Sequence, residues 1–217
     1  AQYNQATLVP DITAYREYWS RTGMEACKSL KCELDVPYGS EKVEILDIFP
    51  AMNNNSPIHI HIHGGAWRQL GKEDVRYPAP NFVAAGATFI PLNFGLTPDY
   101  SISEIINQIR SGVKWVWKNA ASFNGSPDKI FISGASSGAH LAANLLSDDW
   151  QRNFELPENV IKGAVLASGP YDLEPVRLSA RNDYLNLSQI EADNNNPLKH
   201  IPQFGPKIVI CWGDGEL

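Results

Sequence analysis

The feature that most constrains the fold is a short glycine-flanked turn, Gly134-Ala135-Ser136-Ser137-Gly138. Residues 129–133 predict a strand that leads into this turn, and residues 139–146 predict a buried helix that leaves it. A strand-to-helix turn this sharp forces its central residue into strained backbone geometry, and flanking glycines avoid side-chain clashes. Ser136 is therefore a candidate nucleophile, and an ordinary tight turn between strand and helix is the alternative.

A regular succession of strand and helix patterns surrounds this turn. Ser101 and Glu104 have the spacing of a capping box, after which apolar residues recur along one helical face at Ile102, Ile105, Ile106, Ile109, Val113 and Val116. Apolar segments of strand length occupy residues 43–49, 58–63, 87–92, 160–168 and 207–212. This alternation predicts an α/β fold with a mostly parallel sheet, helices on both faces and ligands at the carboxyl ends of the strands.

The chain shows no internal repeat and no linker, so we expect a single domain over residues 1–217. Residues 171–203 interrupt the rhythm, because they are rich in Asn, Asp, Arg and Leu and contain no clear strand. We interpret them as a lid-like insertion of short helices before the penultimate strand.

Composition and charge exclude several classes of protein. Of 217 residues, 43% are hydrophobic, which allows a sizeable core, and the net charge of −6 with no basic stripe argues against a nucleic-acid partner. No segment reads as a membrane span, and residues 1–20 lack the features of a signal peptide, although one already removed would leave no trace. The odd count of three cysteines favours a cytoplasmic protein with free thiols. Assembly into a homo-oligomer stays open.

A second glycine-rich motif, His63-Gly64-Gly65-Ala66-Trp67, follows the strand predicted at 58–63. Acyl transfer to a serine creates a negatively charged oxygen, and backbone N–H groups in a glycine loop can approach it without steric obstruction. We predict an oxyanion hole formed by the N–H groups of Gly65, Ala66 and Ser137, with Gly64 serving the turn.

These motifs, in this order, resemble the α/β-hydrolase superfamily, and within it the esterase and arylformamidase (kynurenine formamidase-like) branch. The resemblance runs from about Val43 to the end and includes residues 168–176 and 182–187. The turn departs from the commoner G-H-S-A-G form, since Ala135 precedes the serine and Ser137 follows it. The resemblance implies an α/β-hydrolase fold and a serine hydrolase that needs no cofactor or metal.

The resemblance also implies the chain order serine, acid, histidine. The acid should follow the strand at 207–212, where Asp214 and Glu216 compete, and the family spacing selects Glu216. The general base is expected to be a histidine beyond Leu217. His200 is the late candidate within the sequence, although it precedes the last predicted strand.

The same resemblance leaves the substrate open among esters, thioesters, formamides and small amides. Four aromatic residues could line an apolar pocket, namely Trp67, Phe94, Tyr171 and Tyr184. They favour a small hydrophobic or aromatic substrate, such as a carboxylic ester or an aryl formamide. Two alternatives stay open: a metal-dependent hydrolase that uses His59 and His61, which alternate on one strand face, and a non-catalytic binding protein with this fold.

Overall fold

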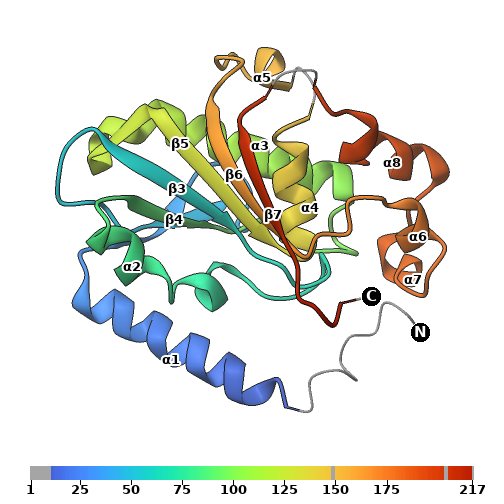
Figure 1. The fold of residues 1–217 in the computed structure, drawn as a ribbon, viewed down its shortest axis with the longest axis horizontal. Coiled ribbons are helices and arrows are strands. Elements are labelled where there is room, and N and C mark those ends of the chain that lie inside the picture. The colour runs from blue at the N-terminus through green and yellow to red at the C-terminus, as the bar shows by residue number, and fades with distance from the viewer. Residues whose placement is uncertain (1–10, 148–149, 203–204, 217) are drawn as a thin grey trace.

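The computed structural model describes residues 11–147, 150–202 and 205–216, whose arrangement is shown in Figure 1. Within these residues seven strands form one sheet in the order β1-β2-β4-β3-β5-β6-β7. The strands are Glu33–Pro37 (β1), Ile45–Ile48 (β2), Ser56–Ile62 (β3), Thr88–Leu92 (β4), Gly125–Ala135 (β5), Ile161–Ala167 (β6) and Lys207–Cys211 (β7). β2 runs antiparallel to both its neighbours, and the strands from β4 to β7 are parallel. The predicted, mostly parallel α/β sheet is confirmed.

Helices cover both faces of this sheet. The longer ones are Thr13–Ser29 (α1), Ala79–Ala84 (α2), Ile102–Asn119 (α3) and Ser137–Asn144 (α4), with short 3₁₀ segments at Lys72–Val75 (η2) and Ala120–Phe123 (η3). α1 and α2 lie on one side of the sheet, and α3 and α4 on the other (Figure 1). Among the described residues, no helix is both long and apolar enough to cross a membrane.

Helix α3 forms for the reasons expected from its sequence. The Ser101 hydroxyl accepts a hydrogen bond from the Glu104 N–H, and the Glu104 carboxylate accepts one from the Ser101 N–H at 2.7 Å, which completes the capping box. The six predicted apolar positions are all buried in the main core. Gly112 lies so close to β4 that an added Cβ would meet a methyl group of Leu92 at 2.7 Å. The helix therefore packs tightly on the sheet.

The structure extends the sequence prediction at the amino-terminal end. β1, α1 and α2 were not predicted, and the predicted strand at 43–49 is shorter, since β2 spans Ile45–Ile48. β1 is an edge strand whose side chains are mostly exposed, so it carries no run of buried apolar residues. Hydrophobic periodicity gives little signal for such a strand.

The parallel strands end together at one edge of the sheet. Ala135, Ala167 and Cys211 are aligned across β5, β6 and β7. Just beyond them, the Ser136 N–H donates to the Ala167 carbonyl oxygen and the Ser168 N–H donates to the Cys211 carbonyl oxygen, both at 2.8 Å. The turns after β5, β6 and β7 are thereby fixed side by side.

The segment that follows β6 contains no strand within residues 171–202. It forms Glu174–Arg177 (α6), Asn182–Leu185 (α7), Gln189–Asn194 (α8) and a 3₁₀ turn at Pro197–Lys199 (η4), which we call the excursion. These helices gather on the side of the molecule toward which the parallel strands point (Figure 1). Their expected role as a lid stays a prediction.

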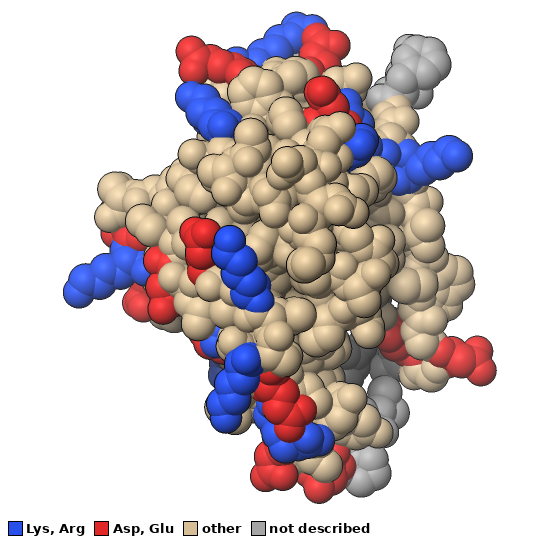
Figure 2. Space-filling view, turned by 90° about the vertical axis from the view of Figure 1, so that its left-hand side faces the viewer, with Lys and Arg blue, Asp and Glu red and all other residues tan. Residues whose placement is uncertain are grey.

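Charged side chains are dispersed over the face that Figure 2 shows. The face in Figure 2 has a largely uncharged centre, and around it the described Lys, Arg, Asp and Glu side chains alternate in sign. This face therefore has no broad basic area of the kind that binds nucleic acid.

Candidate active site

Ser136 sits at the point where β5 turns into α4. Its backbone angles, φ 54° and ψ −125°, lie in a region that residues with a side chain rarely adopt. Two glycines make the turn possible. A Cβ on Gly134 would lie 2.2 Å from the Gly138 carbonyl oxygen, and a Cβ on Gly138 would lie 2.2 Å from the Ile62 carbonyl oxygen. The predicted strand–turn–helix geometry around Ser136 is thus present.

The turn leaves Ser136 half-buried and Ser137 buried at the start of α4. The Ser136 N–H is already engaged by Ala167, whereas Ser137 is the first residue of the helix. The first N–H groups of a helix have no partner within it and attract negative charge. The Ser137 N–H is therefore well suited to an anion that forms beside Ser136.

The glycine-rich loop after β3 comes up against this turn. A Cβ on Gly64 would lie 2.7 Å from the Ala135 carbonyl oxygen and 3.4 Å from the Ser136 Cβ. Gly65 has φ +105°, and a Cβ there would lie 1.9 Å from the Gln69 carbonyl oxygen. Glycine is thus required at both positions. Because these residues have no side chain, the loop backbone can lie next to the candidate nucleophile.

Trp67 anchors the far end of this loop. Its N–H donates to the Ser137 hydroxyl at 3.2 Å, and its carbonyl oxygen accepts from the Thr97 N–H at 2.8 Å. Trp67 is fully buried, and its indole points into the protein. Phe94 is also buried, and its ring stacks on that of His63 at 4.1 Å between centroids. Contrary to the expected pocket, both rings support the loop from inside the core, because neither has appreciable surface to offer a substrate.

An ion cluster around the buried Lys72 and Asp47 fixes the segment that follows the loop. The Lys72 ammonium has no exposed surface and contacts Asp35 at 2.6 Å, Asp47 at 2.8 Å and Glu73 at 2.9 Å. Arg76 binds the second oxygen of Asp47 at 2.7 Å. Burial opposes the charge on Lys72, but its carboxylate hydrogen bonds prevail and raise its pKa. Nothing in the sequence pattern indicated that these distant residues meet.

Glu216 lies at the same edge of the sheet as Ser136. Its carboxylate accepts hydrogen bonds from the Ser168 hydroxyl at 2.6 Å and from the Gly213 N–H at 3.1 Å. Ser168 directly follows Ala167, whose carbonyl oxygen binds the Ser136 N–H. Both Glu216 and Asp214 are exposed, and Glu216 is connected through Ser168 to the turn that borders the candidate nucleophile. No sequence pattern indicated that the Ser168 hydroxyl would bind the Glu216 carboxylate.

Comparison with known proteins assigns this arrangement to a family. A model of the BD-FAE family matches residues 46–214, which include the glycine loop, the Ser136 turn and β7. The chain belongs to the BD-FAE family. The matched region therefore covers most of the sheet and both glycine motifs, whereas Asp35 and Glu216 lie outside it.

Curated proteins that are similar to this chain include kynurenine formamidases and esterases. The chain is 31% identical over 194 residues to a kynurenine formamidase of Danio rerio, covering 88% of this chain and 64% of that protein. It is 34% identical over 149 residues to the esterase LipQ of Mycobacterium tuberculosis, covering 64% of this chain and 35% of that protein. The chain thus spans less than two thirds of the length of these relatives.

Solved structures show the same fold. A structure from Silicibacter sp. tm1040 superimposes with a TM-score of 0.87 at 24% identity, covering 99% of this chain and 80% of that one. Esterase B from Lactobacillus rhamnosis gives a TM-score of 0.71 at 17% identity, covering 91% of this chain and 72% of that one. The predicted α/β-hydrolase fold is confirmed.

Three histidines named in the sequence analysis have partners within the core or the excursion of this BD-FAE chain. The rings of His59 and His61 both bind the Ser133 hydroxyl at 2.7 Å, and burial lowers their pKa values to about 4 and about 3. His200 contacts the Asp193 carbonyl oxygen at 3.2 Å within the excursion. Within residues 11–147, 150–202 and 205–216, no three or more His, Cys, Asp or Glu side chains group as a metal site. The metal alternative and His200 as the base stay predictions.

His63 has a structural place next to the glycine loop. Its Nδ1 lies 2.9 Å from the Gly64 carbonyl oxygen, which can only accept, so Nδ1 carries the proton. Burial lowers the pKa of His63 to about 4, and the ring is neutral at pH 7. Its Nε2 is buried without a hydrogen-bond partner among the described residues. His63 therefore braces the loop as an uncharged group.

The two tyrosines proposed for the pocket lie in different surroundings. The Tyr184 ring, in α7, has the Arg68 guanidinium 4.6 Å from its centroid, which places α7 against the glycine loop. Tyr171 lines an apolar cavity of about 220 Å³ between α4, β6, β7 and η4, together with residues such as Leu166, Leu198 and Ile210. Of the four aromatic residues, these two retain exposed surface.

Proposed function

We propose that the protein is a serine hydrolase that cleaves a small carboxylic ester or aryl formamide through an acyl-enzyme on Ser136. The observation that carries this proposal is the approach of Gly64 to Ser136, since a Cβ on Gly64 would lie 3.4 Å from the serine Cβ. A loop backbone this close to a strained strand-to-helix serine is the arrangement that oxyanion stabilisation requires. Membership of the BD-FAE family and similarity to esterases and formamidases support it.

In the proposed mechanism the Ser136 hydroxyl attacks the substrate carbonyl carbon and gives its proton to a general base. The N–H groups of Gly65, Ala66 and Ser137 bind the resulting oxyanion. Collapse of the tetrahedral intermediate expels the alcohol or aromatic amine, which takes the proton from the base. Water then attacks the acyl or formyl ester of Ser136. The base takes a proton from this water and gives it to the departing Ser136 oxygen, which restores the free enzyme.

We propose a histidine beyond Leu217 as the base and Glu216 as the residue that orients it. The two hydrogen bonds to the Glu216 carboxylate support this role, because they would hold it at the strand edge that Ser136 occupies. The imidazolium formed during attack would be stabilised by this carboxylate. Asp214 is the competing residue, and single substitutions separate the two.

We further propose a small, apolar or aromatic substrate. Tyr184 and Tyr171 support this proposal, because they keep exposed surface that a substrate could contact, whereas Trp67 and Phe94 are buried. The Tyr184 ring, held by Arg68, stands next to the oxyanion loop and would offer an aromatic face to the leaving group. Comparing kcat/KM for an aryl acetate with that for an N-formyl aromatic amine distinguishes ester from formamide cleavage.

The experiment that tests the nucleophile is the intact mass of the full natural protein before and after treatment with a fluorophosphonate. We expect one adduct in the wild type and none in Ser136→Ala. Ser122→Ala is the matched control, because Ser122 is an exposed serine of η3 that belongs to neither glycine motif, and this variant should still be labelled. No adduct in a folded wild type would refute the proposal. Activity that survives in Ser136→Ala and disappears on chelation would favour the metal alternative instead.

A further inference from the structure

The interior of the molecule contains a hydrogen-bonded bridge between the glycine loop and the excursion. It runs from the Trp67 indole through the His140 ring to the backbone of Asn195. The Trp67 Nε1–H donates to His140 Nδ1 at 3.3 Å, and His140 Nε2 lies 2.8 Å from the Asn195 carbonyl oxygen. Both side chains are fully buried. Three segments far apart in the sequence thus meet at one imidazole.

The partners of His140 determine which nitrogen carries its proton. The Trp67 indole can only donate and the Asn195 carbonyl can only accept, so Nδ1 is unprotonated and Nε2 is protonated. The opposite tautomer would set two N–H groups against each other and leave the carbonyl oxygen without this donor. Asn144 Nδ2 lies 3.2 Å from Nε2 but has the His140 carbonyl oxygen at 3.0 Å as its acceptor. The bridge is therefore complete with a neutral imidazole.

The loop end of the bridge needs this support. Ala66 and Trp67 both have positive φ, 54° and 60°, which is unfavourable for residues with a side chain. The Trp67 backbone is held by Ser137 and Thr97, and its side chain is fixed by an edge-on contact with His140 at 5.4 Å between centroids. Loss of the His140 bond would leave the buried indole N–H without an acceptor and loosen the loop that carries Gly65.

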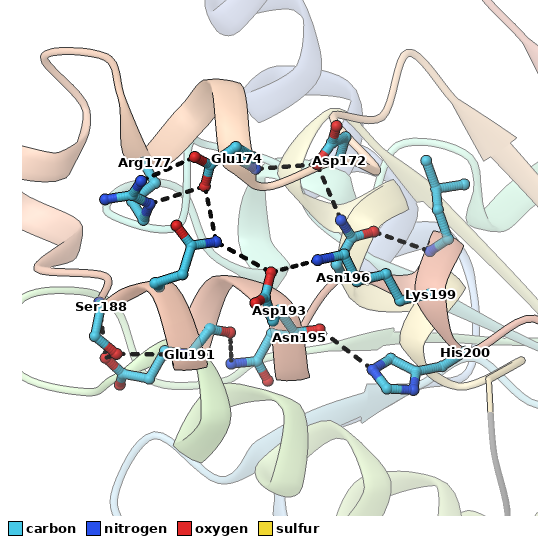
Figure 3. Close-up of polar contacts among 12 residues, drawn as sticks. Asp172, Glu174, Arg177, Ser188, Glu191, Asp193, Asn195, Asn196, Lys199 and His200 are labelled. Atoms are coloured by element: carbon cyan, nitrogen blue, oxygen red, sulfur yellow. Dashed lines mark hydrogen bonds and ion pairs between the residues drawn. The ribbon is translucent and has the colours of Figure 1, made fainter.

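The other end of the bridge belongs to a tightly connected unit. Asn195 is bound through its side chain to the Glu191 carbonyl oxygen at 2.8 Å and to Ser103 of α3 at 2.9 Å. Figure 3 shows that polar contacts link α6, α8 and η4 around it, through Asp172–Asn196, Glu174–Arg177, Gln189–Glu174, Gln189–Asp193 and Asp193–Lys199. If the excursion is displaced, the Asn195 carbonyl group should therefore move together with α6, α8 and η4.

We infer that His140 is a positioning residue that holds the oxyanion loop in register with the excursion. This inference rests on the proposed function, since it assigns His140 a part in the same site. The side chain does not touch the reacting atoms. It sets the position of Trp67, and through it the Gly65 and Ala66 N–H groups that would bind the oxyanion.

Two substitutions in the full natural protein test the inference. His140→Leu removes both hydrogen bonds, whereas His140→Gln keeps an acceptor and a donor on one side chain. We expect kcat on an aryl acetate to fall at least about tenfold in His140→Leu with KM little changed, because a small misplacement of catalytic groups costs up to about 100-fold. We expect His140→Gln to recover most of that loss. Val116→Ala, a core change in α3 away from the bridge, is the control for lowered stability.

Equal losses in His140→Leu and His140→Gln, or a loss in His140→Leu no larger than in Val116→Ala, would overturn the inference. A second measurement does not depend on activity. The ¹⁵N signals of the His140 ring should show Nδ1 unprotonated and Nε2 protonated at pH 7, and the reverse pattern would also overturn the inference. If the wild type neither labels with a fluorophosphonate nor hydrolyses esters, the proposed function has failed, and the tautomer still decides whether the bridge exists.

Discussion

Gly138→Ala tests how closely the candidate nucleophile and the glycine loop depend on each other. The added Cβ would lie 2.2 Å from the Ile62 carbonyl oxygen and 2.4 Å from the His63 carbonyl oxygen. Ordinary contact begins near 3.4 Å, so α4 and the end of β3 must separate by about 1 Å. The obstacles are backbone atoms on both sides, and no side chain can rotate away to relieve the clash.

The expected effect has two parts. Forcing one methyl group into a well-packed core costs about 3 kcal/mol, which corresponds to a fall in melting temperature of roughly 6–12 °C for a chain of this size. Separation of α4 from β3 also moves Ser136 and Ser137 away from the glycine loop. Misplacement by about 1 Å lowers kcat about 100-fold, far beyond the effect of lowered stability at a temperature where the variant is folded.

The assay is steady-state hydrolysis of an aryl acetate at 20 °C, combined with urea unfolding of the same samples. Gly86→Ala is the control, because φ is +82° there but no atom lies within 4 Å of the added Cβ. It should lose about 1 kcal/mol from backbone strain and keep its activity. A Gly138→Ala protein with kcat within about threefold of the wild type would refute the close approach of α4 and β3 that the reasoning requires.

Three further predictions follow from buried and exposed charges. Lys72→Met should lower the free energy of unfolding in urea by about 3 kcal/mol, because Asp47 loses a buried partner; a loss below about 1 kcal/mol would contradict this. Glu216→Gln should lower kcat at least about 100-fold while Asp214→Asn has little effect, and the opposite ranking would reassign the acid. His140 has a pKa lowered by burial to about 4. Since the unfolded chain binds this proton near pH 6.5, stability should fall by roughly 3 kcal/mol between pH 7 and pH 4, and His140→Gln should remove that part of the decline.

The parts of the fold that the sequence predicted are those where local pattern and burial agree. The apolar face of α3, the strands from β3 to β6 and the turn around Ser136 have strong signals, because each is largely buried and bounded by a cap or a glycine. β7 was predicted from its run of apolar residues, although its side chains are exposed. β1 and α1 lie at the margins of the sheet and have many exposed side chains, so periodicity does not mark them.

The sequence predicted the backbone turns of the candidate site, but not which side chains contact one another there. The glycines at 64, 65, 134 and 138 identify close approaches, since a clash-free turn needs them whatever surrounds it. The assignment of Trp67 to a pocket failed for a different reason. An aromatic residue beside a catalytic loop can face either the substrate or the core, and only the contacts of its indole with His140 decide between them. The contacts of Ser168 and Lys72 were missed because partners of both lie far away in the sequence: Glu216 follows β7, and Asp35 and Asp47 lie in β1 and β2.

Four residues around the candidate site, Ala66, Trp67, Ser136 and Ser168, all have positive φ between 54° and 60°. Each such conformation costs of order 1–3 kcal/mol in a residue with a side chain, and the rest of the fold supplies that energy. Glycine at 136 would relax the strain and remove the proposed nucleophile in a single codon change. Selection for heat resistance alone would therefore favour glycine at position 136 and with it inactive proteins. Selection for turnover would keep the strained serine, although glycine would make the protein more stable.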